Sequence, residues 1–112
     1  MGRSPVTVIA VLTNLPDSES AFNLARELVR RRVAACVNVL PAATSFYRWD
    51  GKFEEASEHP VLVKSTQDRY ADLEAAIREL HPYEVPEIIA WPVTAGLPAY
   101  LAWIEQESRP DG

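Results

Sequence analysis

Short apolar runs rich in β-branched side chains alternate along the chain with segments whose apolar positions recur at helical spacing. Residues 5–13 read PVTVIAVLT and are bounded by a proline and by the turn-like NLPD. A run so short and so rich in valine predicts a strand buried on both faces. Residues 18–32 place alanine or leucine at 21, 24, 25 and 28, which predicts an amphipathic helix with one buried stripe. Asp17 precedes that helix and is expected to cap it.

Two long β-patterned segments joined by a tight turn occupy the middle of the chain. Residues 33–49 predict a second strand that breaks or bulges near Pro41, because proline has no N–H to donate to a sheet. Asp50 and Gly51 predict a hairpin turn, and residues 52–66 return as the third strand. Arms this long in so small a chain predict a hairpin whose tip projects beyond the body of the subunit.

A helix, a strand and a last short helix complete the pattern. Ser65 and Asp68 fit a capping box that opens a helix at residues 67–80, residues 87–93 read as the fourth strand, and Pro98 begins the final helix. The order βαββαβ plus a terminal helix predicts an α+β fold of the ferredoxin-like, split βαβ type, with two helices on one face of the sheet.

We expect a single domain over residues 1–112, because that length suits one hydrophobic core. Residues 5–107 are expected to form the ordered core, and residues 108–112 a frayed tail.

The sheet face opposite the two helices is expected to need a cover. The second and fourth strands are apolar on both faces, whereas a face exposed to water would alternate toward polar residues. An open face of this kind exceeds the few hundred Å² of apolar patch that monomers tolerate. The final helix could cover part of this face, but about 10 residues of helix span only about 15 Å, too little for the whole face. We therefore expect copies of the chain to cover the face, and a charge at Val37 to release monomers unless Val37 faces the helices.

The composition narrows the classes of partner. The chain is 47% hydrophobic and 24% charged, within the globular range, and its formal net charge of −5 disfavours nucleic acid and anionic lipid. No apolar run approaches the roughly 20 residues of a membrane span. The single cysteine, Cys36, excludes an internal disulfide and suits a reducing compartment. These features predict a cytoplasmic protein with neither nucleic acid nor a membrane as partner.

Cys36 and His81 are the candidate soft metal donors. A cysteine in an apolar strand is commonly a buried, inert side chain, and an apolar environment disfavours the thiolate that a metal requires. His81 ends a helix before Pro82, where a protonated imidazole can cap the last carbonyls, although imidazole also suits copper or zinc. One histidine with Glu84 or Glu87 supplies too few donors, so any metal site would have to be completed by the hairpin or by a second subunit.

Other chemistry is sparse. Glu54, Glu55, Glu58 and His59 form an acidic patch that is either a solvated strand face or a weak attractor of divalent ions. A cysteine–histidine nucleophile pair would lack an orienting group and an oxyanion loop, and no phosphate-binding glycine motif is present. The sequence therefore predicts a protein without catalytic activity.

Four motifs in order resemble those of the CutA family of divalent-ion tolerance proteins. That family carries an Ala-Ala-Cys strand running into a proline, a Tyr-x-Trp-x-Gly-Lys hairpin, a His-Pro-Tyr-x-x-Pro-Glu segment and a Tyr-Leu-x-Trp ending. Here these read AACVNVLP, YRWDGK, HPYEVPE and YLAW, and the resemblance runs from about Val8 to Ile104.

The resemblance implies a homotrimer of ferredoxin-like subunits, similar in architecture to the PII signalling proteins. It further implies tolerance of copper and other divalent ions, weakly bound and without catalysis. The alternative is a PII-like signalling or scaffold trimer whose intersubunit cleft takes a small molecule or a protein partner. An enzyme that uses Cys36 as a nucleophile ranks last.

The same resemblance assigns site residues. Cys36 and His81 match the family's cysteine and histidine and are the candidate metal ligands. Some members carry a cysteine where Thr13 stands and a second histidine where Leu80 stands, so a copper site of that type loses half its donors here. The resemblance, with Glu84 from the adjoining segment, predicts a group that builds the trimer and its cleft: Tyr47, Trp49, Glu58, Lys64, Tyr83, Glu84, Glu87 and Trp103.

Overall fold

The computed structural model describes residues 6–110. Residue 5, at the start of the expected core, and residues 111–112 of the expected tail lie outside the described residues. The elements are β1 (Val8–Leu15), α1 (Ser18–Arg30), β2 (Cys36–Val39), β3 (Ala43–Trp49), β4 (Lys52–Thr66), a 3₁₀ turn (Gln67–Arg69), α2 (Tyr70–Leu80), β5 (Ile89–Pro92) and α3 (Pro98–Glu107).

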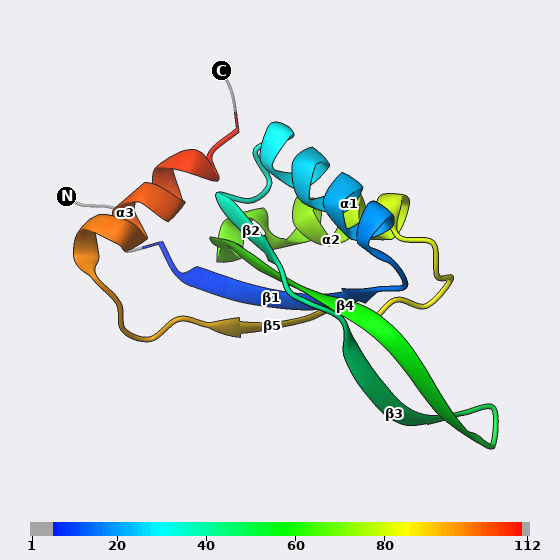
Figure 1. The fold of residues 1–112 in the computed structure, drawn as a ribbon. Helices are drawn as coiled ribbons and strands as arrows, with labels where there is room; N and C mark the ends of the chain where they lie inside the picture. The colour runs from blue at the N-terminus through cyan, green and yellow to red at the C-terminus, as the bar shows by residue number, and fades with distance from the viewer. Residues whose placement is uncertain (1–5, 111–112) are drawn as a thin grey trace.

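The strands form one antiparallel sheet in the order β2-β4-β1-β5, and β3 pairs with the outer part of β4. Helices α1 and α2 lie together on one face of this sheet, and α3 lies at its end (Figure 1). The predicted ferredoxin-like α+β arrangement with an extra terminal helix is therefore confirmed. The break that Pro41 predicted is also present, because β2 ends at Val39 and β3 begins at Ala43.

The hairpin of β3 and β4 extends away from the body of the protein, as predicted (Figure 1). Its turn places Asp50 at φ 52° and Gly51 at φ 76°, the left-handed geometry that a two-residue hairpin turn requires. The chain measures 55 × 26 × 23 Å along its principal axes. The hairpin therefore presents much of its own surface outside the core.

The core lies between the helices and the sheet. Asp17 caps α1 as predicted, since its Oδ1 accepts a hydrogen bond from the Ser20 N–H at 2.7 Å. Each of α1 and α2 packs one apolar stripe against the sheet. The sheet contributes alternate side chains of β1 and β4 to this contact. The fully buried members of this core are Ile9, Val11, Leu15, Ala21, Leu24, Leu28, Ala34, Val61, Val63, Leu73 and Ile77.

The capping box predicted from Ser65 and Asp68 is wrong. The Ser65 hydroxyl is buried and donates to the Val33 carbonyl at 2.7 Å, because Ser65 lies on the face of β4 that the helices cover. Asp68 accepts instead from the Thr66 hydroxyl at 2.6 Å, and the chain enters α2 through a 3₁₀ turn without a side-chain cap.

Val37 faces the helices. It lies opposite Val63, and it packs with Val39 against the helix-side core. The adjacent residues Val33 and Ala34 both contact that core, whereas Ala35 packs with Val8 and Ile104. Residues 33–35 therefore do not simply alternate between the two faces of the sheet. A charge at Val37 would enter the core, and it is therefore no test of the opposite face.

The opposite face, called the open face below, carries two cross-strand rows of mainly apolar residues. The α3 end of this face is covered by Ile104, which packs with Val8 and Ala35. Farther along, Ile89 is 51% exposed and Trp91 is 43% exposed. The register of the strands gives the rows as Cys36, Lys64, Ala10 and Trp91, and Asn38, Leu62, Leu12 and Ile89.

Leu73→Ala tests the helix-side core. Leu73 is fully buried, so truncation should leave a cavity and lower the free energy of unfolding by about 2–5 kcal/mol. Leu97→Ala is the matched control: its side chain is 70% exposed, and its effect should stay within about 0.5 kcal/mol. Urea denaturation followed by circular dichroism measures both. Equal effects of the two substitutions would contradict this core.

Candidate functional site

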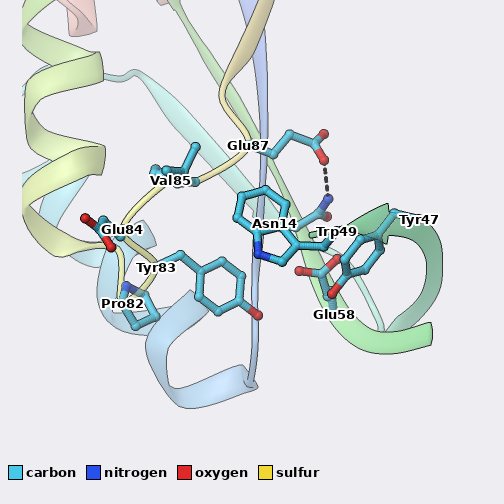
Figure 2. A pocket seen from close by; sticks show the side chains of 10 residues that line it. Asn14, Tyr47, Trp49, Glu58, Pro82, Tyr83, Glu84, Val85 and Glu87 are labelled. Atoms are coloured by element: carbon cyan, nitrogen blue, oxygen red, sulfur yellow. Dashed lines mark hydrogen bonds between the residues drawn. The ribbon is translucent and has the colours of Figure 1, made fainter. Parts of the chain in front are cut away.

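A pocket of about 680 Å³ lies between the base of the hairpin, the end of β1 and the segment that joins α2 to β5 (Figure 2). This volume is within the range of small-molecule sites. The residues that line it are Asn14, Tyr47, Trp49, Glu58, Pro82, Tyr83, Glu84, Val85, Pro86 and Glu87.

Three separate parts of the chain build the pocket. Tyr47 and Trp49 are two residues apart on β3, so they project from the same face of the hairpin. Glu58 comes from β4, at the point where that strand passes from pairing with β1 to pairing with β3. Tyr83 reaches toward these residues from the segment after α2 (Figure 2). The site therefore depends on tertiary structure, because its walls come from positions far apart in the sequence.

The joining segment is fastened to β1 by hydrogen bonds. The Asn14 side chain donates to Glu87 Oε1 at 3.0 Å, drawn as a dashed line in Figure 2. His81 makes two more bonds, since its Nε2 lies 2.7 Å from the Asn14 carbonyl and its Nδ1 lies 3.1 Å from the Tyr83 N–H. The position of Tyr83 in the pocket follows from this fastening.

These partners fix the state of His81. A carbonyl can only accept and an N–H can only donate, so Nε2 carries the proton and Nδ1 is the acceptor. His81 is 6% exposed, and its ring packs against Tyr83 at a centroid distance of 4.9 Å. Burial lowers the pKa of His81, while the bond to Asn14 and the charge of Glu58 act in the opposite direction. The ring is a neutral structural link, so it neither caps α2 as a cation nor leaves a ring nitrogen free for a metal.

The pocket has a negative electrostatic character. Glu58, Glu84 and Glu87 line it, and none of its described lining residues is a lysine, an arginine or a histidine. Glu58 is 9% exposed. Burial raises the pKa of Tyr83, and the charge of Glu58 raises it further, with contributions from Tyr47 and from a hydrogen bond to Glu58. The arrangement favours a positively charged ligand.

Cys36 lies away from this pocket. Its thiol is half-buried on the open face, 3.9 Å from Asn38 Oδ1, and its strand partner is Lys64. Ala10 lies beyond Lys64 in the same row, whereas His81 binds to Asn14, four residues farther along β1, or about 13 Å. Cys36 and His81 therefore do not share a site within one chain. Within residues 6–110, no group of three histidine, cysteine, aspartate or glutamate side chains is placed to hold a metal.

The predicted cleft residues divide into two groups. Tyr47, Trp49, Glu58, Tyr83, Glu84 and Glu87 line the pocket of a single chain. Lys64 and Trp103 belong to a separate cluster near α3, where the Lys64 ammonium lies 5.9 Å from the centre of the Tyr100 ring. Tyr100 in turn stacks on Trp103 at 5.7 Å. Within one chain the group therefore forms two clusters, and its role in building a trimer and an intersubunit cleft stays a prediction.

Sequence reasoning missed the remaining lining residues, Asn14, Pro82, Val85 and Pro86, as parts of a site. The available signals were the polar Asn14 at the end of an apolar strand and the closely spaced prolines. The acidic patch also divides, since Glu58 faces the pocket while Glu55 is exposed and His59 Nδ1 lies 3.2 Å from the Leu40 carbonyl.

The two positions at which the chain departs from the metal-site pattern lie on the helix side. Thr13 is fully buried, and Leu80 packs against the helix-side core. Neither residue lines the pocket. The absence of a cysteine at position 13 and of a histidine at position 80 therefore does not alter the lining of the pocket.

Comparison with known proteins identifies relatives across nearly the whole chain. The family model described as "CutA1 divalent ion tolerance protein" matches residues 9–107. A mouse protein named Protein CutA is 43% identical over 94% of this chain, and the match spans 59% of that protein's length. The divalent-cation tolerance protein CutA of Thermus thermophilus is 43% identical over 88% of this chain and 95% of its own.

Solved structures agree in fold. The crystal structure of CutA from Xylella fastidiosa superposes with a TM-score of 0.89 at 42% identity, and the match covers 91% of this chain and 98% of the other. A protein of Archaeoglobus fulgidus named periplasmic divalent cation tolerance protein CutA gives a TM-score of 0.87 at 31% identity, over 91% and 99% of the two chains.

The state of His81 predicts a pH dependence of stability. Its pKa in the folded chain lies below the ordinary value of 6.5, so the unfolded chain binds more protons below that pH. The contribution of neutral His81 to the free energy of unfolding is complete above pH 6.5. It is lost as the pH falls through the pKa of His81 in the folded chain. The urea concentration at the midpoint of unfolding should therefore be lower at about pH 5 than at about pH 7.5.

His81→Asn should remove this pH dependence and should itself lower the free energy of unfolding by about 1–3 kcal/mol, because it disrupts two partly buried hydrogen bonds. His59→Asn is the matched control and should keep the pH dependence of the original chain. An unchanged pH profile in His81→Asn would show that His81 is not the group responsible.

Proposed function

The chain belongs to the CutA1 divalent ion tolerance family, and from this premise we propose that it contributes to tolerance of divalent cations as a non-catalytic homotrimer. In this proposal the trimer binds divalent ions weakly, copper among them. The observation that carries the proposal is the match to the family model over residues 9–107. Two of the relatives, those of Thermus thermophilus and Archaeoglobus fulgidus, are themselves named divalent-cation tolerance proteins.

The open face supports assembly. Exposed Ile89 and Trp91 lie on it beside half-buried Leu12 and Leu62, so water would meet a broad apolar surface. Strands β2 and β5 also stand at the two edges of the sheet, where the outer backbone groups have no partner strand among residues 6–110. Copies of the same chain would cover the apolar face and use these edges, which is the reason for proposing a self-assembled protein.

The donors of one chain do not fit a tight metal site. Both ring nitrogens of His81 are engaged, and Cys36 has an amide oxygen and a lysine as its polar neighbours. Cys36 lies on the face that other copies would cover, so an assembly can add a neighbour's donors to its thiol. An ion held between copies of the chain by few donors would be bound weakly. Such an ion would exchange with solution, as a transported or buffered ion does, and would not be a permanent cofactor.

A second candidate function follows from the pocket. Its volume of about 680 Å³ and its aromatic and acidic lining suit a small ligand, as in a signalling or scaffold protein. In both candidates the protein is without catalytic activity. An enzyme that uses Cys36 as a nucleophile is not favoured, because the thiol donates to Asn38 Oδ1, an amide oxygen that cannot act as a general base.

The compartment proposed for this function is the cytoplasm, on the basis of the single cysteine. Among residues 6–110, no helix is long and apolar enough to cross a membrane. The name of the Archaeoglobus protein assigns that relative to the periplasm. Fractionation of cells that carry the tagged chain would distinguish the two compartments.

Ile89→Asp tests the assembly. The side chain stands on the open face, so a buried, unpaired charge there should release monomers of 12.5 kDa from an assembly three times that mass. Phe22→Asp, at a comparable 48% exposure on α1, should leave the trimer intact. Sedimentation velocity measures both masses. A wild-type monomer, or a trimeric Ile89→Asp protein, would contradict the proposal.

Copper titration by calorimetry tests the metal function. Weak, saturable binding is expected, and Cys36→Ser should weaken it by at least about tenfold, because the thiol is the soft donor. His81→Asn should leave copper affinity unchanged, since no ring nitrogen is free. Binding lost in His81→Asn but kept in Cys36→Ser would move the site to the histidine. No binding to a well-formed trimer would remove the metal function and leave the second candidate.

A further inference from the structure

We propose that the pocket binds the head of a small primary ammonium ligand, an organic cation with an apolar body, and that Glu58 anchors its nitrogen. The inference rests on the second candidate function, since it names the ligand class of the same pocket. It does not depend on the metal function.

The carboxylate of Glu58 is buried in the pocket. Glu58 is 9% exposed and lines the pocket, where the Tyr83 hydroxyl is a neighbour that interacts with its carboxylate. An ionised carboxylate can accept about four hydrogen bonds. Burying such a group with few donors is costly, and a cationic ligand with N–H donors would supply what the chain does not.

Three aromatic rings line the pocket around this carboxylate. Tyr47 and Trp49 face the pocket from the hairpin, and Tyr83 faces it from the joining segment (Figure 2). Within residues 6–110, the ring contacts are Phe46 with Phe53, His81 with Tyr83, and Tyr100 with Trp103. The hairpin rings therefore do not stack on Tyr83, and they are partly open to solvent, with Tyr47 42% and Trp49 59% exposed. Aromatic ring faces attract cations and also pack against alkyl groups.

The chemistry favours an organic cation over a bare metal ion. Aromatic faces offer no lone pairs of the kind that Ca²⁺, Zn²⁺ or Cu²⁺ requires, and the three glutamates of the pocket are not grouped as metal ligands. Glu87 is held by Asn14, which leaves Glu58 as the buried charge. A primary ammonium on an alkyl body matches both parts of the lining, because its N–H groups meet the carboxylate and its carbons meet the rings.

Calorimetric titration of the wild-type chain with n-butylammonium chloride tests the proposal, and 1-butanol is the neutral probe of the same shape. Saturable binding of butylammonium is expected, with butanol at least about tenfold weaker. Glu58→Gln keeps the shape of the side chain and should weaken butylammonium binding by at least about tenfold. Glu55→Gln, an exposed position on the same strand, should leave it unchanged.

Each contrary result overturns the inference. Equal binding of butanol would make the pocket merely apolar, and equal binding by Glu58→Gln would remove the anchor. Absence of butylammonium binding would also overturn it. If a basic side chain of a neighbouring copy fills the pocket, Glu58→Gln should in addition shift the assembly toward monomers in sedimentation. The copper titration and the Ile89→Asp measurement proceed independently, so failure here leaves the metal and trimer proposals standing.

Discussion

The backbone pairing of β4 is the constraint on which the rest of the structure depends. This strand has 15 residues, about 50 Å at the usual rise, and it pairs with β1, β2 and β3. Its inner part holds the centre of the sheet, and its outer part forms one arm of the hairpin. Glu58 stands where the one part passes into the other, so the strand that organises the core also delivers the buried carboxylate to the pocket.

A second set of contacts determines the shape of the site. The chain leaves α2 at His81, whose ring joins the Asn14 carbonyl to the Tyr83 N–H, and Asn14 also holds Glu87. A neutral imidazole suits this role because it offers one donor and one acceptor in fixed directions. The residue with the most obvious metal chemistry in the sequence therefore acts as a structural link, and its effect on the pocket is to hold the aromatic ring of Tyr83 in position.

The open face and the pocket impose different requirements. The open face is mainly apolar and calls for burial, which suits a surface between copies of the chain. The pocket combines rings with carboxylates and suits a cation. Cys36 belongs to the open face and Glu58 to the pocket, so metal binding and organic-ligand binding can be separated by substitution at these two residues.

The sequence by itself determined the order of the elements, the Asp50–Gly51 turn, the projecting hairpin and the apolar face that the helices leave uncovered. Each of these follows from local periodicity or from the backbone preferences of single residues. Tertiary structure alone decided that Val37 faces the helices, that Ser65 binds Val33 instead of capping a helix, and that Asn14 completes the pocket. The physical reason is that a short offset in strand register reverses the direction of a side chain, and such offsets are set by pairing between distant segments.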